Sequence, residues 1–147
     1  MTLALSTIRT NVYTDVYNHL QTGTYAITTN NIHPVWKDEQ LQDESHPQVI
    51  ITNIIVPEDK ITFGRVGMYE VSISFTIEAH HNSAANARTL ADEILSKFKG
   101  AGKAVLESAK LNNIKLDSES YDMINWAPNE LDHVYTMLFT ARYIGSS

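Results

Sequence analysis

The sequence predicts an α+β fold: an antiparallel sheet of about four strands, with an N-terminal helix and a central helix packed on one face, plus an extended β-arm or loop. Three patterns support this prediction. An apolar helical stripe runs through residues 5–20, a long alternation of apolar and polar residues runs through 68–80, and two strand-like runs close the chain. About 150 residues is a usual domain size, so we treat 1–147 as a single domain.

The first helix is expected from about residue 6 to residue 20, with Ser6 or Thr7 as its N-cap and Gly23 beyond its end. One face of this helix is apolar at helical spacing. Its members are Leu5, Ile8, Val12, Val16 and Leu20. Short strand-like runs follow at 24–28 and 32–36, and the polar stretch 37–47 is typical of a solvated loop.

Residues 48–56, "QVIITNIIV", are rich in β-branched side chains and apolar on both faces except at Asn53. This composition predicts a strand that is covered on both sides. Pro57 ends it, and residues 57–67 carry charges and two glycines, which predicts an extended loop or arm.

The stretch "MYEVSISFTIEAH" has the clearest pattern in the chain. Its alternation predicts one long strand with a buried face and a wet face. The expected buried residues are Tyr69, Val71, Ile73, Phe75, Ile77 and Ala79, and the expected wet ones are Glu70, Ser72, Ser74, Thr76 and Glu78.

The central helix should begin after an N-cap at Asn82 or Ser83. Its apolar stripe is Ala87, Leu90, Ala91, Ile94, Leu95 and Phe98. A further helical turn or two is expected over 103–111, "KAVLESAKL". The runs 114–126 and 130–145 then read as two strands that pair in an antiparallel hairpin.

Composition excludes several kinds of function. The formal net charge is -6 with histidine neutral, and no basic run occurs, so the chain is not expected to bind nucleic acid or anionic membranes. With no cysteine, disulfides, thiolate catalysis and cysteine-based metal sites are excluded. No stretch is long and apolar enough to span a bilayer.

The adjacent His80 and His81 are the most conspicuous candidates for chemistry. Neighbouring residues on a strand point to opposite faces, so the pair should not bind one ion together. Glu78 and His80 do share a face, but they leave a metal site at least one ligand short. We therefore interpret the two histidines as the corner between a strand and a helix.

No other catalytic pattern stands out. The sequence has no Gly-x-Ser-x-Gly element, and its paired acids lack the alternating pattern and glycine of an EF-hand loop. We expect no catalytic residue, no cofactor and no metal, and we do not expect an enzyme.

The pattern predicts more exposed β-surface than a small monomer needs, and such edges are often covered by copies of the same chain. Seven tyrosines fit this reading, since tyrosine is enriched at interfaces. The predicted interface residues are Lys60, Phe63 and Arg65 on the arm, and Glu70, Ser72, Ser74 and Thr76 on the wet face of the long strand.

Four segments together carry a resemblance to a known family. They are the long strand "MYEVSISFTIEAHH", the polar corner "NSA", the helix "ANARTLADEILSKF" and the closing run "HVYTMLFTARYIG". In this order, after an amphipathic helix and an arm, they resemble the tail terminator (tail-completion) proteins of long-tailed bacteriophages. The resemblance is one of pattern over nearly the whole chain.

The resemblance implies a structural virion protein of the phage tail and neck, assembled in the host cytoplasm. It implies a hexameric ring on the last ring of the tail tube protein, which ends tube polymerisation and joins the tail to the head connector or neck protein. DNA would pass through the lumen without specific binding, and no membrane would be involved. Ring formation requires a head-to-tail interface that closes on itself.

Three alternatives stay open at this point. One is another neck, head-completion or sheath-capping virion protein, which differs only in its partner. A second is a small α+β metal-dependent enzyme or ligand-binding domain that uses Glu78, His80 and His133. A third is a dimer of the ferredoxin-like kind, which a measured native mass would reveal.

Overall fold

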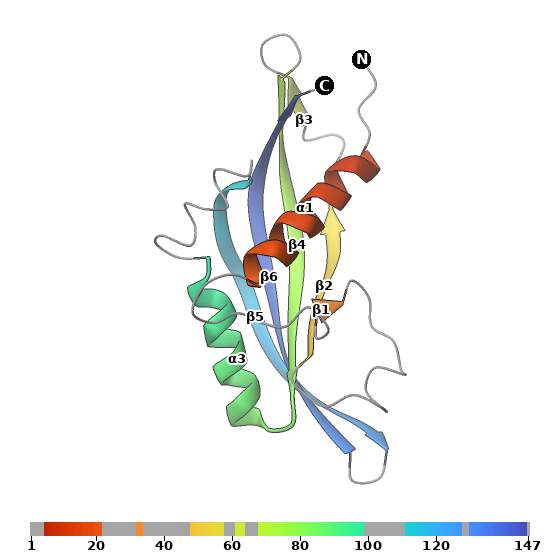
Figure 1. Ribbon diagram of the computed structural model, residues 1–147, viewed down its shortest axis with the longest axis vertical. Coiled ribbons are helices and arrows are strands. Elements are labelled where there is room, and N and C mark those ends of the chain that lie inside the picture. Colours follow the sequence, from red (N-terminus) through yellow and green to blue (C-terminus); the bar gives the residue numbers. More distant parts are fainter. Residues whose placement is uncertain are drawn as a thin grey trace.

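The computed structural model describes residues 5–21, 32–33, 48–57, 61–63, 68–98, 111–127 and 130–146. They form a six-stranded sheet with two α-helices (Figure 1), so the predicted α+β class is confirmed. The elements are α1 (Leu5–Leu20), β1 (Ile32–His33), β2 (Gln48–Ile55), β3 (Ile61–Phe63), β4 (Met68–His81), α3 (Ala84–Ser96), β5 (Leu111–Ala127) and β6 (Glu130–Ser146).

The strands lie in the order β1-β2-β4-β6-β5, and β3 pairs with β4 as well. The β1/β2 pair is parallel and all the other pairs are antiparallel. The four long strands, β2, β4, β5 and β6, correspond to the sheet of about four strands that the sequence predicts. The short strand β1 lies inside the strand-like run predicted at 32–36, whereas β3 was not expected as a strand and lies inside the predicted arm.

One face of the sheet forms the core. The alternation in β4 is confirmed at Tyr69, Val71, Ile73, Phe75, Ile77 and Ala79, all of which are buried. Across the strand pair, Val71 lies opposite Tyr143 and Phe75 lies opposite Phe139. Phe139 and Tyr143 of β6 are therefore buried on the same face of the sheet as Val71 and Phe75.

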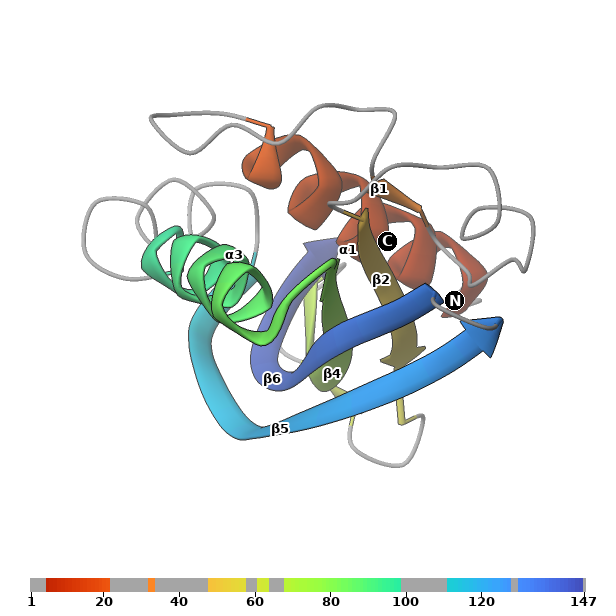
Figure 2. The same cartoon turned by 90° about the horizontal axis from the view of Figure 1, so that it is seen from below.

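Both helices cover this same face. Viewed along the strands, α1 and α3 lie on the concave side of the curved sheet (Figure 2). The predicted stripe of α1 is buried at Ile8, Val12, Val16 and Leu20, and that of α3 is buried at Ala87, Leu90, Ala91 and Ile94. Each fully buried aliphatic side chain of this size contributes roughly 1.5–3 kcal/mol, so packing against the sheet supplies most of the helices' stability.

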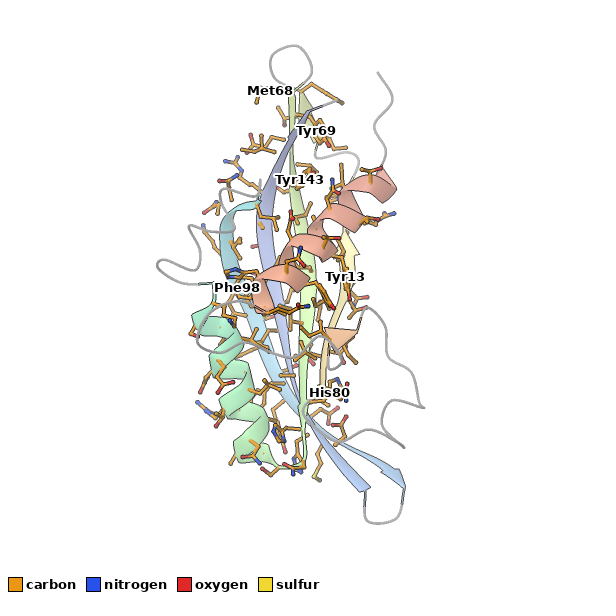
Figure 3. The ribbon with its side chains drawn as sticks, viewed as in Figure 1. Tyr13, Met68, Tyr69, His80, Phe98 and Tyr143 are labelled. Carbon is orange, nitrogen blue, oxygen red and sulfur yellow. The ribbon has the colours of Figure 1, made fainter. Side chains whose placement is uncertain are left out.

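Local signals fix the start of α3. The side chain of Ser83 accepts a hydrogen bond from the backbone N–H of Asn86, which confirms Ser83 as the N-cap. After the helix, Phe98 packs on Phe139 with ring centroids 4.8 Å apart, and Phe139 stacks on Phe75 at 5.3 Å. His19 of α1 contacts Phe98 at 5.6 Å, so the aromatic cluster joins both helices to the sheet (Figure 3).

Strand β2 differs from the prediction in its second half. Gln48 to Ile51 are buried on both faces as expected, but Ile55 is 55% exposed. The cause is an irregularity: Asn53 has a positive φ of 50°, and the register with β4 shifts between Thr52 and Ile55. An asparagine in this conformation is typical of a bulge, which here turns Ile55 outward while Ile54 and Val56 still pack in or against the core.

Several predictions fall on other parts of the chain. The runs 24–28, 34–36 and 37–47 lie outside the described residues, and so do 103–110 of the expected extra helical turn. The last residue of that turn, Leu111, is wrong as a helix assignment. It begins β5 and is buried opposite Tyr143 on β6, because pairing with a long neighbouring strand overrides the weak helical pattern.

Candidate assembly interface

The wet face of β4 carries four of the predicted interface residues. Ser72 is exposed, and Ser74 is half-buried. Both line a hollow of about 400 Å³ on this face. Its other lining residues are Ile55 and Pro57 after the bulge, Ile73, Asp117 of β5, and Leu138 and Thr140 of β6. This hollow crosses four strands of the sheet, and its polar and aliphatic lining suits contact with another protein better than with a metal.

Glu70 lies on the same face and already has a partner. Its Oε1 atom is 2.8 Å from Nε of Arg142 on β6, and both side chains are substantially exposed. An exposed ion pair of this kind contributes little to stability, about 0–1 kcal/mol. The pair can therefore exchange partners at a protein interface at low cost.

Thr76 corrects the prediction of an exposed face. Its exposed fraction is only 7%. It lies opposite Thr52 of β2 on one side and Leu138 of β6 on the other, so its short side chain is shielded by neighbours in the middle of the sheet. Ile50 and Val134 are also buried farther along this face. Of the β4 residues on this face, Ser72 is exposed and Glu70, Ser74 and Glu78 are half-buried.

The predicted arm is described only in part. Phe63 ends β3 opposite Tyr69, and 57% of it is exposed, as an interface residue requires. Lys60 and Arg65 lie outside the described residues. The structure thus brings Phe63 to the same flank of the sheet as Ile55, and it places Ser72 and Ser74 on the neighbouring strand.

His80 and His81 point to opposite faces, as predicted for adjacent strand residues. His81 lies opposite His133 on the face that carries the helices. His80 lies on the other face, labelled in Figure 3, where Nδ1 donates a hydrogen bond to Asp132 at 2.6 Å and Nε2 donates to Glu78 at 2.9 Å. His80 and Asp132 are each only 1% exposed.

This arrangement favours a charged imidazole. Burial lowers the pKa of His80, but the hydrogen bonds from the ring to Asp132 and Glu78, together with their charges, outweigh burial and raise that pKa above 6.5. Both ring nitrogens then carry protons and point at carboxylates, so neither offers a lone pair to a metal ion. Among the described residues, no group of three or more histidine, aspartate or glutamate side chains is arranged to hold a metal.

Asp132 is the member of this cluster that the sequence did not reveal. It is 52 residues from His80 along the chain, and only the register of β4 with β6 brings the two together. The sequence did contain a signal for it. Asp132 has the same alternation as Val134 and lies near the start of the last predicted strand. The cluster joins the base of the β5–β6 hairpin to the end of β4.

The β5–β6 hairpin also exposes an aromatic cluster on the helix-bearing face. The Tyr121 hydroxyl forms a hydrogen bond with Nδ1 of His133 at 2.6 Å. The Tyr121 ring also packs on Tyr135, with centroids 5.1 Å apart. Tyr121 and its neighbour Met123 remain largely exposed. A rigid, exposed tyrosine cluster of this kind is typical of protein contact surfaces.

Comparisons with known proteins support the fold. Neither described helix is long and apolar enough to cross a membrane. No protein-family model matches the chain, and no curated protein matches its sequence. Among solved structures, the chain is similar to one from a structure described as the virion of a native gene transfer agent (GTA) particle. The TM-score is 0.60 with 15% sequence identity, over 88% of this chain and 92% of that chain. At this identity, the likeness shows a shared fold.

Proposed function

We propose that this chain is a structural virion protein that forms a hexameric ring on the end of a phage tail tube. The ring ends tube polymerisation and presents the surface to which the head connector binds. The observation that carries the proposal is the fold similarity to a chain of a GTA virion, which extends over nearly the full length of both chains. The resemblance of the sequence pattern to tail terminators supports the same role.

The described surface fits a role in assembly better than a role in catalysis. Its conspicuous features are exposed apolar side chains, a broad hollow over four strands and a tyrosine cluster. Glu78, His80 and Asp132 form a largely buried ionic cluster, in which the His80 ring hydrogen-bonds to both carboxylates. It stabilises the sheet in this proposal and takes no part in a reaction.

The acidic charge of the chain agrees with a ring around DNA. A net charge of -6 per subunit repels phosphates, so a duplex can move through the lumen without being held or read. The protein resides in the virion at the tail–neck junction in this proposal, after assembly in the host cytoplasm.

The first test is the native mass of the purified chain, measured by light scattering over a range of concentrations, with negative-stain images of the largest species. We expect rings with a central hole and a mass six times that of the 16.5 kDa chain. The second test adds the chain to its phage's own tail tube protein during polymerisation. We expect tubes that stop growing and carry a ring at one end.

Three outcomes would contradict the proposal. Tubes that grow to the same length with and without the chain, and that show no added density at their ends, would exclude the capping role. A compact dimer that neither forms rings nor binds tubes would favour the ferredoxin-like alternative. Binding to isolated connectors but not to tube ends would place the protein in a different layer of the neck.

A further inference from the structure

Among the residues that the structure describes, the exposed large apolar side chains fall into two groups. The first, here called the β2–β3 patch, consists of Ile55, Phe63 and Met68, and the second, called the β5 patch, consists of Leu116, Tyr121 and Met123. The β2–β3 patch lies on β2, β3 and the first residue of β4, with Ile55 and Met68 on the face away from the helices and Phe63, opposite Tyr69, on the helix-bearing face. The β5 patch lies on the strand at the other end of the sheet order. Each patch therefore marks one of two opposite edges.

The edge that bears the β2–β3 patch also contains a hollow. Arg9, Thr10 and Tyr13 of α1, together with residues 51–54 of β2, line a space of about 310 Å³. Of the described strands, only β1 pairs with β2 on this side, and it does so only at Val49 and Ile50. The hollow is lined by aliphatic, aromatic and uncharged polar side chains, and Arg9 is its only charged lining residue.

The opposite edge is a long strand with complementary properties. Residues 115–123 of β5 are exposed without a break. They include one lysine and three acids, Asp117, Glu119 and Asp122, so this edge is acidic. Among the described strands β5 pairs with β6 alone, which leaves its outer side available.

We propose that the β5 edge of one copy of this chain docks in the α1–β2 hollow and on the β2–β3 patch of a second copy. The apolar side chains of the β5 patch then cover the second copy's exposed edge, and the acids of β5 lie near Arg9. Because the two surfaces differ and lie on opposite sides of the sheet, the contact is head-to-tail, the kind that closes into a ring. This inference rests on the proposed function and names the surfaces through which the ring forms.

The chain has no cysteine, so introduced cysteines report on this contact directly. We would prepare Thr10→Cys in the hollow and Met123→Cys on the β5 edge, and treat them with a short bismaleimide. Mixing the two variants should give several-fold more cross-linked dimer than either variant alone. The matched control is a mixture of Thr10→Cys with Thr89→Cys, because Thr89 is exposed on α3 and belongs to neither of the two proposed surfaces.

Charge reversal tests the electrostatic part of the contact. Adding Arg9→Glu to the Thr10→Cys partner should lower the cross-linking yield about tenfold, since like charges then face each other. Adding Glu119→Arg to the Met123→Cys partner should restore much of the yield. Arg88→Glu, which reverses an exposed arginine on α3, should leave the yield unchanged.

Each outcome bears on the contact. A mixed yield no higher than the Thr89 control, or cross-links mainly between identical positions, would overturn this inference. Hexameric rings that lack the cross-link would overturn the contact while leaving the proposed function intact. A chain that carries both cysteines and cross-links into ladders beyond six subunits would support the contact and contradict the closed ring.

Discussion

The Glu78–His80–Asp132 cluster makes the sharpest prediction about stability. In Asp132→Asn, the side chain keeps its shape but loses its charge and becomes a poor acceptor for the imidazolium. The change removes the shorter of the two hydrogen bonds of His80, at 2.6 Å, from a site where both partners are 1% exposed. We expect a clear loss in the free energy of unfolding.

Two features of the structure set the size of that loss. Breaking a buried ion pair by removing one partner typically costs about 3–5 kcal/mol. Here Glu78 remains 2.9 Å from the ring, and His80 can release its proton, so we expect about 2–3 kcal/mol at pH 7. Glu78→Gln should cost less, about 1 kcal/mol, because the side chain of Glu78 is 26% exposed.

The same cluster makes stability depend on pH. The pKa of His80 is raised above 6.5 in the folded state. Between pH 6.5 and that folded-state pKa, the native protein therefore holds a proton that the unfolded chain has released. The contribution of His80 to the free energy of unfolding is complete below pH 6.5 and is lost as the pH rises through the folded-state pKa. The slope of this loss is at most about 1.4 kcal/mol per pH unit. Burial lowers the pKa of His19 below 6.5, so the contribution of His19 to stability changes with pH only below about 6.5.

Urea denaturation at pH 6.5, 7.5 and 8.5 would measure both effects. The unmodified chain should lose stability across this range, whereas Asp132→Asn should give a flatter profile and a lower midpoint at pH 6.5. The two proteins should converge as the pH rises. A variant within about 0.5 kcal/mol of the unmodified chain at pH 7, or one with the same slope, would refute the assignment of a charged, buried His80.

Substitutions at three further positions test the packing and the N-cap of α3, each by urea denaturation. Phe139→Ala removes the centre of the aromatic cluster and should cost about 3–5 kcal/mol, and a loss below 1 kcal/mol would contradict its place in the core. Gly145→Ala should cost about 1–3 kcal/mol because the new methyl group would meet the ring of Tyr69, and a neutral result would mean that this ring moves freely. Ser83→Ala removes the N-cap of α3 and should cost about 1 kcal/mol, whereas Ser83→Asp should restore most of that loss.

The parts of the fold that could be predicted are those with a strong local period. Apolar and polar residues alternate along the whole of β4, and α1 has an apolar residue at nearly every fourth position. The buried faces of both elements could therefore be predicted from the sequence. Strand β2 shows the limit of this reasoning. Its uniform apolar composition indicated cover on both sides, but the bulge at Asn53 and its place near a sheet edge leave Ile55 exposed.

Which residues are exposed, and which lie side by side, depends on segments that are far apart in the sequence. Thr76 belongs to the polar alternation of β4, yet it is buried because its neighbours on β2 and β6 shield it. The ionic cluster depends on the register that places Asp132 beside His80. A period identifies which face a residue occupies, but pairing between strands decides which part of that face is covered.

The position of β6 has a consequence for how the chain matures. This strand follows every other described element in sequence, yet it lies between β4 and β5 in the sheet. As the chain leaves the ribosome, β4 and β5 emerge without the strand that joins them. Until β6 arrives, the long apolar alternation of β4 has an open side that is prone to non-native pairing. Protection of nascent chains by chaperones should therefore matter most during synthesis of residues 82–146.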